Sequence, residues 1–459
     1  MDNIWLLTEE RPKPSVIQQI IDAYCADFGD HCTPNGDIKI RPHIENGVFA
    51  FVYEVEGITL SNAQNIYLKT VSGYSSFLDF TLYKQVEAPV ENDNSQIPLM
   101  GIEETKTNDD ESRNTGVNQR ISKFVFFRHY YPNTQLYMLY NEELEAREDK
   151  KPSDTNIFGT NILLTLNIKV IGKDMSTWFH AFTSLDEMIA FKQRMSPPHP
   201  GNVPIQINRS GNIITVSGRL SKPATAGNIA YDPNIGTLSM IGAGLRKLGW
   251  QGDIVLTQHH VSQRYVSSNP YNKLLYNCKI LDMKLDGLTL PTITLPQYYW
   301  HYEKSSEKLA SILLHVQCMY RGIKCIYENH AGCERGYFVK QDGGLTALPK
   351  AIQNGKIPDV ILYDEATRFI VLVEGKKLST LSDGLREIRL FDRIEQDHIY
   401  PEYGNVTILR CLTIFGGEEQ ALPDRDVLFY LTDSGRIIIN SNAPTCIVNS
   451  FSGTGVSYM

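Results

Sequence analysis

The most informative stretch of the chain covers residues 357–377 and reads IPDVILYDEATRFIVLVEGKK. Two apolar runs, Asp359 to Tyr363 and Phe369 to Val373, flank a short polar segment, and this pattern predicts a β-hairpin. In a hairpin the beginning of one strand lies beside the end of its partner, so we expect Asp359 and Glu374 to meet at one end of the sheet. Lys376 should share a face with Glu374, because side chains on a strand alternate with a period of two.

These residue types suit one kind of chemistry. Two carboxylates attract a hard divalent cation such as Mg²⁺. A lysine beside them can orient a nucleophilic water and stabilise developing negative charge. The alternative is that Asp359 begins a turn while Glu374 and Lys376 form a solvated pair on a strand. Pro-Asp and Glu-x-Lys are each common by chance, but they rarely flank two strongly apolar β runs, which favours the functional interpretation.

This arrangement resembles the PD-(D/E)xK nuclease family, whose members include many restriction endonucleases and cleave phosphodiester bonds with Mg²⁺. The resemblance implies that Asp359 and Glu374 are metal ligands and that Lys376 is the catalytic lysine. It also implies an α/β fold with a mixed-sheet nuclease core. The family often adds an acid from a preceding helix, and Glu307 lies at a suitable place in the sequence, although no motif aligns it.

A second constellation repeats this logic nearer the start of the chain. Asp79 lies within FLDFTLY, and Glu104 and Lys106 end the run IPLMGIEETK, so a second, longer hairpin is predicted. By the same resemblance, Asp79 and Glu104 would hold a metal and Lys106 would be the lysine. Leucine, rather than proline, precedes Asp79. The alternative is an acidic surface hairpin, which the acids at 109–111 favour.

Two candidate centres bear on how a duplex would be cut. The strands of DNA have opposite polarity, and a single centre cuts one of them. Cleavage of both strands therefore needs a dimer, two successive events or two centres in one chain. The sequence predicts the third possibility.

The predicted fold class is α/β, with a mixed α/β region between two nuclease-like modules. Helix, hairpin, helix and strand follow one another in the last third, as in an α/β core. The expected domains are a nuclease-like module at 1–150, a DNA-recognition region at 151–300 and a second nuclease-like module at 301–459. A charged stretch at 142–157 and the prolines between 291 and 296 mark the two boundaries. The main predicted elements are helices at 15–28, 240–248, 305–320 and 382–399, and strands at 161–171, 253–256, 406–412 and 426–430; the aromatic run 124–131 fits either a helix or a strand.

Sequence specificity requires residues that read base edges, and the middle third contains suitable types. Arginine can read guanine and glutamine can read adenine in the major groove. For any single one of these residues, a place on the surface of a folded spacer is the simpler interpretation. The candidate DNA-binding residues are Arg219, Lys222, Gln258, His259, Gln263 and Arg264.

Composition narrows the class of protein. The chain has 44 Lys+Arg against 52 Asp+Glu, a net charge of −8, which excludes a globally basic, histone-like DNA binder. A local basic groove is still compatible, because binding follows local potential. No apolar run approaches the roughly 18 residues that a membrane span needs. The first residues do not read as a signal peptide, so a cytoplasmic location is expected.

Together these features predict a Type II restriction endonuclease, a Mg²⁺-dependent hydrolase that cuts double-stranded DNA at a specific sequence. No methyltransferase signature is visible, so the cognate DNA methyltransferase of the restriction-modification pair would be a separate protein. The nuclease would act as a monomer or homodimer. The alternatives are a repair or junction-resolving nuclease with the same centre, and a DNA-binding protein whose nuclease cores are degenerate.

Overall fold

The computed structural model describes residues 1–8, 11–73, 77–105, 116–140, 152, 154–173, 175, 177–195, 205–218, 232–257, 261–268, 273–301, 307–329, 336–348, 352–418 and 421–459. These residues form a mixed α/β protein with several sheets. The chain divides into two compact units, the first made of 1–14, 30–72 and 302–459, and the second of 15–29 and 73–301. This division differs from the expected three segments, because residues 30–72 group with the last third and the predicted middle region shares a unit with 73–150.

The first unit is built around a seven-stranded sheet with the order β15-β18-β19-β20-β21-β22-β23. The strands of this unit are β1 (Asn3–Thr8), β2 (Cys32–Glu45), β3 (Val48–Leu60), β4 (Ile66–Thr70), β15 (Lys324–Glu328), β16 (Tyr337–Val339), β17 (Leu345–Ala347), β18 (Val360–Asp364), β19 (Phe369–Lys377), β20 (Thr407–Phe415), β21 (Val427–Leu431), β22 (Ile437–Ile439) and β23 (Ser457–Tyr458). Its helical segments are α8 (Leu309–Tyr320), η2 (Leu378–Thr380), α9 (Leu381–Glu387), η3 (Ile388–Leu390), α10 (Asp392–Ile394), η4 (Glu395–Ile399), α11 (Tyr400–Tyr403) and α12 (Thr445–Ser450).

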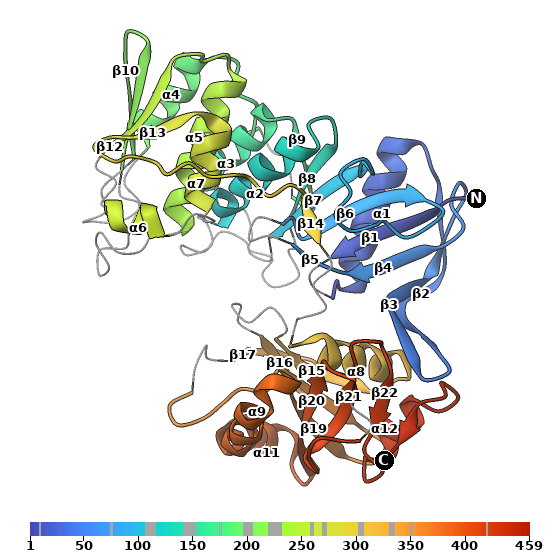
Figure 1. Ribbon diagram of the computed structural model, residues 1–459. Helices are drawn as coiled ribbons and strands as arrows, with labels where there is room; N and C mark the ends of the chain where they lie inside the picture. The colour runs from blue at the N-terminus through green and yellow to red at the C-terminus, as the bar shows by residue number, and fades with distance from the viewer. Residues whose placement is uncertain are drawn as a thin grey trace. The chain divides into compact units, whose positions relative to one another are not determined.

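The predicted hairpin at 357–377 is confirmed as β18 and β19, which pair antiparallel. β19 then pairs in parallel with β20, and β20 in parallel with β21 (Figure 1). The helical segments between β19 and β20 contribute Ile388, Phe391 and Ile394 to a core that contains Ile370 and Leu372 of β19. The continuous helix predicted at 382–399 is wrong in detail, because this stretch is divided into short α, 3₁₀ and π segments.

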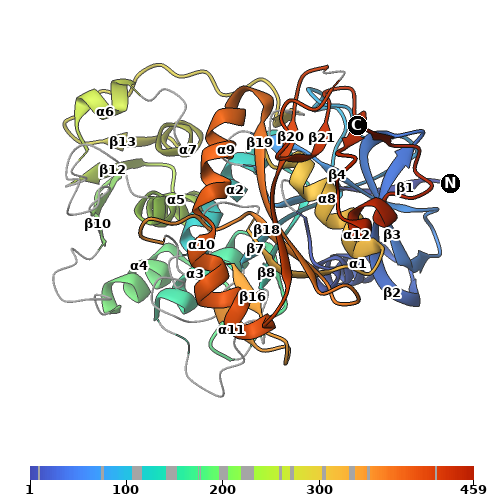
Figure 2. The same cartoon turned by 90° about the horizontal axis from the view of Figure 1, so that it is seen from below.

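Two helices cover opposite faces of the β18–β19 hairpin (Figure 2). On one face, Gly375 lies against α8, where an added Cβ would come within 2.9 Å of Ser311 Oγ and 3.0 Å of the Glu307 carbonyl oxygen. On the other face, Gly384 of α9 lies against Lys376, where an added Cβ would come within 2.8 Å of Lys376 Cγ. The two glycines allow both helices to approach β19 closely, and so they fix the surroundings of its polar end.

The second unit contains two four-stranded sets, β6-β7-β8-β9 and β10-β11-β12-β13. Its strands are β6 (Phe80–Gln85), β7 (Met100–Thr105), β8 (Gln135–Tyr140), β9 (Ile168–Ile171), β10 (Gln206–Ser210), β11 (Ile213–Ser217), β12 (Asp253–Thr257) and β13 (Met283–Leu285). Two short strands, β5 (Ser72–Gly73) and β14 (Trp300–His301), pair with each other near the beginning and the end of the segment 73–301. Its helices are α1 (Pro14–Phe28), α2 (Gly116–Tyr130), α3 (Asp154–Thr165), α4 (Leu185–Arg194), α5 (Asp232–Lys247), α6 (Gln263–Ser268) and α7 (Lys273–Leu281). Helices α2, α3, α5 and α7 pack against one another (Figure 1).

The second predicted hairpin and the helix at 15–28 are also confirmed, as β6–β7 and α1. The undecided run 124–131 is helical, in α2. The strand predicted at 161–171 is wrong in its first half, which belongs to α3. This helix is buried on nearly all sides, so it has no polar face to produce a helical period in the sequence. The charged boundary region predicted at 142–157 falls mostly outside the described residues.

No helix in the described part of the chain combines the length and the apolar character that crossing a bilayer demands.

Arg11 links the first residues of the chain to the last third. Its largely buried guanidinium donates hydrogen bonds of 3.2 and 2.7 Å to the two carboxylate oxygens of Glu328 on β15. Breaking such a pair leaves a partly buried charge without its partner. We therefore expect Arg11→Ala to lower the free energy of unfolding by about 1–3 kcal/mol, measured by urea denaturation.

The matched control is Lys324→Ala, which removes an exposed ion pair to Glu365 at the other end of β15. Exposed pairs contribute only about 0.2–1 kcal/mol, so this variant should unfold close to wild type. Equal effects of the two substitutions would contradict the view that Arg11 anchors the first segment.

Candidate functional site

The end of the β18–β19 hairpin brings together the three residues predicted there. Val360 pairs with Val373, which places Asp359 and Glu374 at adjacent positions just beyond this pair. The Asp359 Oδ2 atom accepts a 3.0 Å hydrogen bond from the Gly375 backbone N–H. Glu374 Oε1 accepts a 2.8 Å hydrogen bond from the Lys376 ammonium. The proximity of Asp359, Glu374 and Lys376 is therefore as the hairpin pattern predicts.

Three further side chains complete this C-terminal site, and the sequence did not single them out. Lys308, directly before α8, lies 3.1 Å from Asp359 Oδ1. Lys356 lies 3.3 Å from Glu374 Oε1, and both Lys356 and Lys376 lie 3.0 Å from Glu387 Oε2 at the end of α9. The site thus contains three carboxylates and three ammonium groups.

Charge and burial shift the pKa values in this site. Burial, together with the neighbouring charge of Asp359, raises the pKa of Glu374 to about 7 despite the two lysines beside it. Burial alone would lower the pKa of Lys376, but the charges and hydrogen bonds of Glu374 and Glu387 raise it well above its usual value. Although burial opposes it, hydrogen bonds from Lys356 and Lys376 lower the pKa of Glu387. Glu374 is therefore the acid for which ionisation is least favourable.

One observation bears on whether this site fits a cation. No donor in the described part of the chain forms a hydrogen bond to the buried Oε2 of Glu374, although the Glu374 and Glu387 carboxyl groups lie within hydrogen-bonding reach of each other. A buried carboxylate oxygen without a donor is costly, and either a proton shared with Glu387 or a divalent cation would satisfy it. A cation here would draw on the carboxylates of Asp359 and Glu374. The described residues contain no group of three or more His, Cys, Asp and Glu side chains placed to hold a metal ion.

The N-terminal site has the same backbone arrangement, but its register differs from the predicted one by a residue. Phe80 pairs with Ile102, so Asp79 and Glu103 occupy the places that Asp359 and Glu374 occupy in the C-terminal site. Asp79 Oδ2 accepts a 2.8 Å hydrogen bond from the backbone N–H of Glu104, just as Asp359 does from Gly375. Glu103, not the predicted Glu104, therefore faces Asp79.

The amine of the N-terminal site comes from a helix. Lys123 of α2 lies 3.1 Å from Asp79 Oδ1 and 2.8 Å from Glu103 Oε1. Arg120, one turn earlier, lies 3.6 Å from Glu103 Oε1. Lys106, the predicted lysine, lies outside the described residues, and Thr105 stands where the C-terminal site has Lys376.

The pKa values in the N-terminal site are shifted strongly. Burial, reinforced by the charge of Asp79, raises the pKa of Glu103 to about 8. Burial also acts to raise the pKa of Asp79, but the charges of Lys123 and Arg120 outweigh it, and the pKa falls below its usual value. The two acids raise the pKa of Lys123 well above its usual value, against the effect of burial.

Most of the predicted DNA-binding residues, namely Arg219, Lys222, Gln258 and His259, lie outside the described residues. Gln263 and Arg264 are exposed on α6. The Gln263 amide donates to the Thr289 carbonyl oxygen at 2.9 Å and accepts from the Thr289 N–H at 2.9 Å. The Gln263 side chain thus anchors a neighbouring loop. The DNA-binding role of Arg264 stays a prediction.

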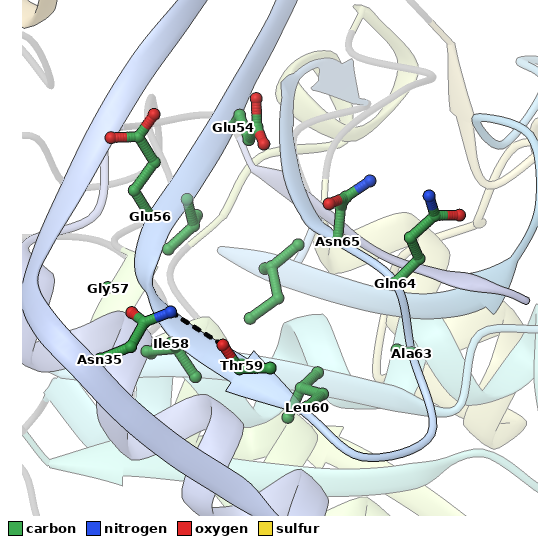
Figure 3. A pocket seen from close by; sticks show the side chains of 12 residues that line it. Asn35, Glu54, Glu56, Gly57, Ile58, Thr59, Leu60, Ala63, Gln64 and Asn65 are labelled. Atoms are coloured by element: carbon green, nitrogen blue, oxygen red, sulfur yellow. Dashed lines mark hydrogen bonds between the residues drawn. The ribbon is translucent and has the colours of Figure 1, made fainter.

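The described residues of the first unit include two hollows of note. One, of about 230 Å³, lies beside β3, with Glu54 and Glu56 extending from that strand and Gln64 and Asn65 from the segment before β4 (Figure 3). Arg41 forms ion pairs with both of these glutamates. The other, of about 440 Å³, is lined by Lys377 and Leu378 after β19 and by Phe415 and Gly416 after β20. It therefore lies at the carboxyl ends of two parallel strands, directly beyond Lys376.

The raised pKa of Glu374 predicts a specific pH dependence of stability. An acid whose pKa is higher in the folded than in the unfolded state favours folding at low pH, and this contribution is lost as the pH rises through about 7. Without divalent cations, Glu374→Gln should therefore gain stability relative to wild type between pH 5 and pH 8, by about 1–3 kcal/mol. Thermal unfolding at both pH values, in chelator, measures this difference.

Glu365→Gln is the matched control, because Glu365 is an exposed carboxylate at the other end of the same hairpin. Its unfolding temperature relative to wild type should change little between the two pH values. Suppose instead that Glu374→Gln is less stable than wild type at pH 8, and that its stability relative to wild type is no higher at pH 8 than at pH 5. This result would contradict the inference that burial makes the ionised form of Glu374 costly.

Comparisons with known proteins add no further assignment. No protein-family model, no curated protein and no solved structure matches this chain. The interpretation of both sites therefore depends on their geometry and chemistry.

Proposed function

We propose that the chain is a Mg²⁺-dependent endonuclease that hydrolyses phosphodiester bonds in double-stranded DNA at the C-terminal site. The observation that carries this proposal is the acid pair Asp359–Glu374, with one buried oxygen of Glu374 unsatisfied and Lys376 hydrogen-bonded to the other. The family resemblance of the motif supports the same reading, and so does the α/β hairpin on which the motif lies.

Each described side chain has a role that its position supports. Asp359 and Glu374 would hold the cation, which, when bound, would offset the charge of the acids and of the scissile phosphate. Lys376 would orient a water molecule and stabilise the negative charge that develops on phosphate oxygens. Gly375 N–H holds the Asp359 carboxylate in place, so the acid is oriented before substrate binds.

Lysines around the site favour an anionic substrate. Lys308 and Lys356 flank the two acids, and Lys377 lines the adjoining hollow. These ammonium groups come from three different segments of the chain. They offset the negative potential of the paired carboxylates, which would otherwise repel DNA. The net charge of −8 is therefore compatible with DNA binding at this place.

Within this proposal, the protein is a Type II restriction endonuclease that acts in the cytoplasm, with its cognate methyltransferase as a separate protein. Sequence-specific cutting separates this reading from a repair or junction-resolving nuclease. Incubation with plasmid DNA and Mg²⁺, followed by sequencing of the ends, should return one recurring sequence around the cuts. Ends without a shared sequence would exclude the restriction enzyme and favour the structure-selective alternative.

Variants of the site test the chemistry itself. Asp359→Asn and Lys376→Ala should each lower the rate of plasmid cleavage by at least about 10²–10³-fold, because they remove a cation ligand and the group that stabilises developing charge. DNA binding in Ca²⁺, followed by fluorescence anisotropy, should persist in Lys376→Ala if the loss is in catalysis. Glu365→Gln, a charge change at the far end of the hairpin, should cut like wild type.

Two results would contradict the proposal. The first is full cleavage by Asp359→Asn, which would place the active centre elsewhere. The second is a wild-type chain that binds DNA but never cuts it with Mg²⁺ or Mn²⁺, which would make the protein a DNA-binding module.

A further inference from the structure

The two sites share one backbone plan. In each, an antiparallel hairpin carries an acid just before its first strand and a second acid on its second strand, and the latter strand continues through a helical connection to a parallel neighbour. In each, the backbone N–H after the second acid donates to the first acid. The helical connection covers the face that carries the second acid, through α9 in one case and α2 in the other.

The positive charges, however, are arranged differently. In the C-terminal site different lysines serve the two acids: Lys308 contacts Asp359, whereas Lys376 contacts Glu374. In the N-terminal site a single ammonium, that of Lys123, contacts both acids. The strand residue equivalent to Lys376 is Thr105, which is neutral and buried.

The carboxylate oxygens differ accordingly. Glu103 Oε2 accepts from the Asp79 N–H at 3.1 Å and from Lys123 at 2.9 Å, and Glu103 Oε1 lies 2.8 Å from Lys123. Both oxygens of Asp79 are also engaged, by Lys123 and by the Glu104 N–H. All four oxygens of the N-terminal acids therefore have a protein partner, in contrast to the buried Oε2 of Glu374.

From this contrast we infer that the N-terminal site is a second copy of the C-terminal one in which the Lys123 ammonium takes the place of the divalent cation. The site is then closed to metal in the wild-type chain, because a cation could enter only by displacing a largely buried ammonium from between two acids. Arg120 adds a second positive charge beside Glu103, which further disfavours a cation at this place.

This inference rests on the proposed function, because it takes the C-terminal acids as the metal site. It departs from the expectation of two working centres in one chain. Each chain would cut one strand at a time, and cleavage of both strands would need a second copy of the chain or a second binding event. The N-terminal acid pair would serve stability and not catalysis.

The test counts Mn²⁺ ions bound per chain, by electron paramagnetic resonance of free Mn²⁺ during titration. Wild type should bind one ion with high affinity, and Glu103→Gln should still bind one. Lys123→Ala should bind two, because removal of the ammonium exposes the Asp79–Glu103 pair. If Lys123→Ala fails to fold, the test uses Lys123→Met, which keeps the length and packing of the side chain. The comparison of ion counts between wild type and Glu103→Gln does not depend on either Lys123 variant.

The outcomes separate this inference from the proposed function. Two ions in wild type, with one lost in Glu103→Gln, would overturn the inference and leave the proposed function intact. A count of one in a folded Lys123 variant would also overturn it. No ion in wild type, with no change in Glu374→Gln, would instead remove the proposed function, while the gain of an ion in Lys123→Ala would still support the replacement of metal by lysine.

DNA cleavage supplies a second readout. Glu103→Gln should give the same ratio of nicked to linear plasmid as wild type, because the C-terminal site performs both cuts. A Glu103→Gln enzyme that stops at nicked circles would show a working second centre and overturn the inference.

Discussion

The candidate site depends on the register of one pair of strands. Because Val360 pairs with Val373, the residues just beyond them, Asp359 and Glu374, come to the same end of the ribbon. The Gly375 N–H then fixes the Asp359 carboxylate. A shift of one residue would turn Glu374 toward the opposite face, since side chains alternate along a strand. The buried apolar residues of β18 and β19 oppose such a shift, so the hydrophobic core specifies the geometry of the polar end.

The same rule explains what could and could not be predicted at the two hairpins. At the C-terminal one, a single glutamate follows the apolar run, so only Glu374 could meet Asp359, and the sequence was sufficient. At the N-terminal one, Glu103 and Glu104 are adjacent, and the family pattern selected Glu104 because Lys106 follows it at the expected spacing. Only the pairing of Phe80 with Ile102 shows that Glu103 holds the equivalent place.

The lysines from outside the motifs could not have been assigned by spacing. Lys308 precedes α8 and Lys356 lies in a loop, so their approach to the acids depends on tertiary packing. Lys123 offered a weak signal, because it lies four residues before the buried Phe127 on α2 and therefore on the same face. The breaks in the helical stretch after β19 had no comparable signal, since Ile388, Phe391 and Ile394 fit one continuous apolar stripe equally well.

Paired acids in a low-dielectric setting can be stabilised by a bound metal or by fixed ammonium groups, and we propose that the two sites use these two solutions on one backbone plan. In this proposal the C-terminal pair holds the metal. Crystals soaked in Mn²⁺ and measured at an anomalous wavelength would reveal such an ion. One strong anomalous peak is expected within coordination distance of Asp359 and Glu374. An ordered site without such a peak, with Lys376 still bonded to Glu374 at saturating Mn²⁺, would contradict the proposal.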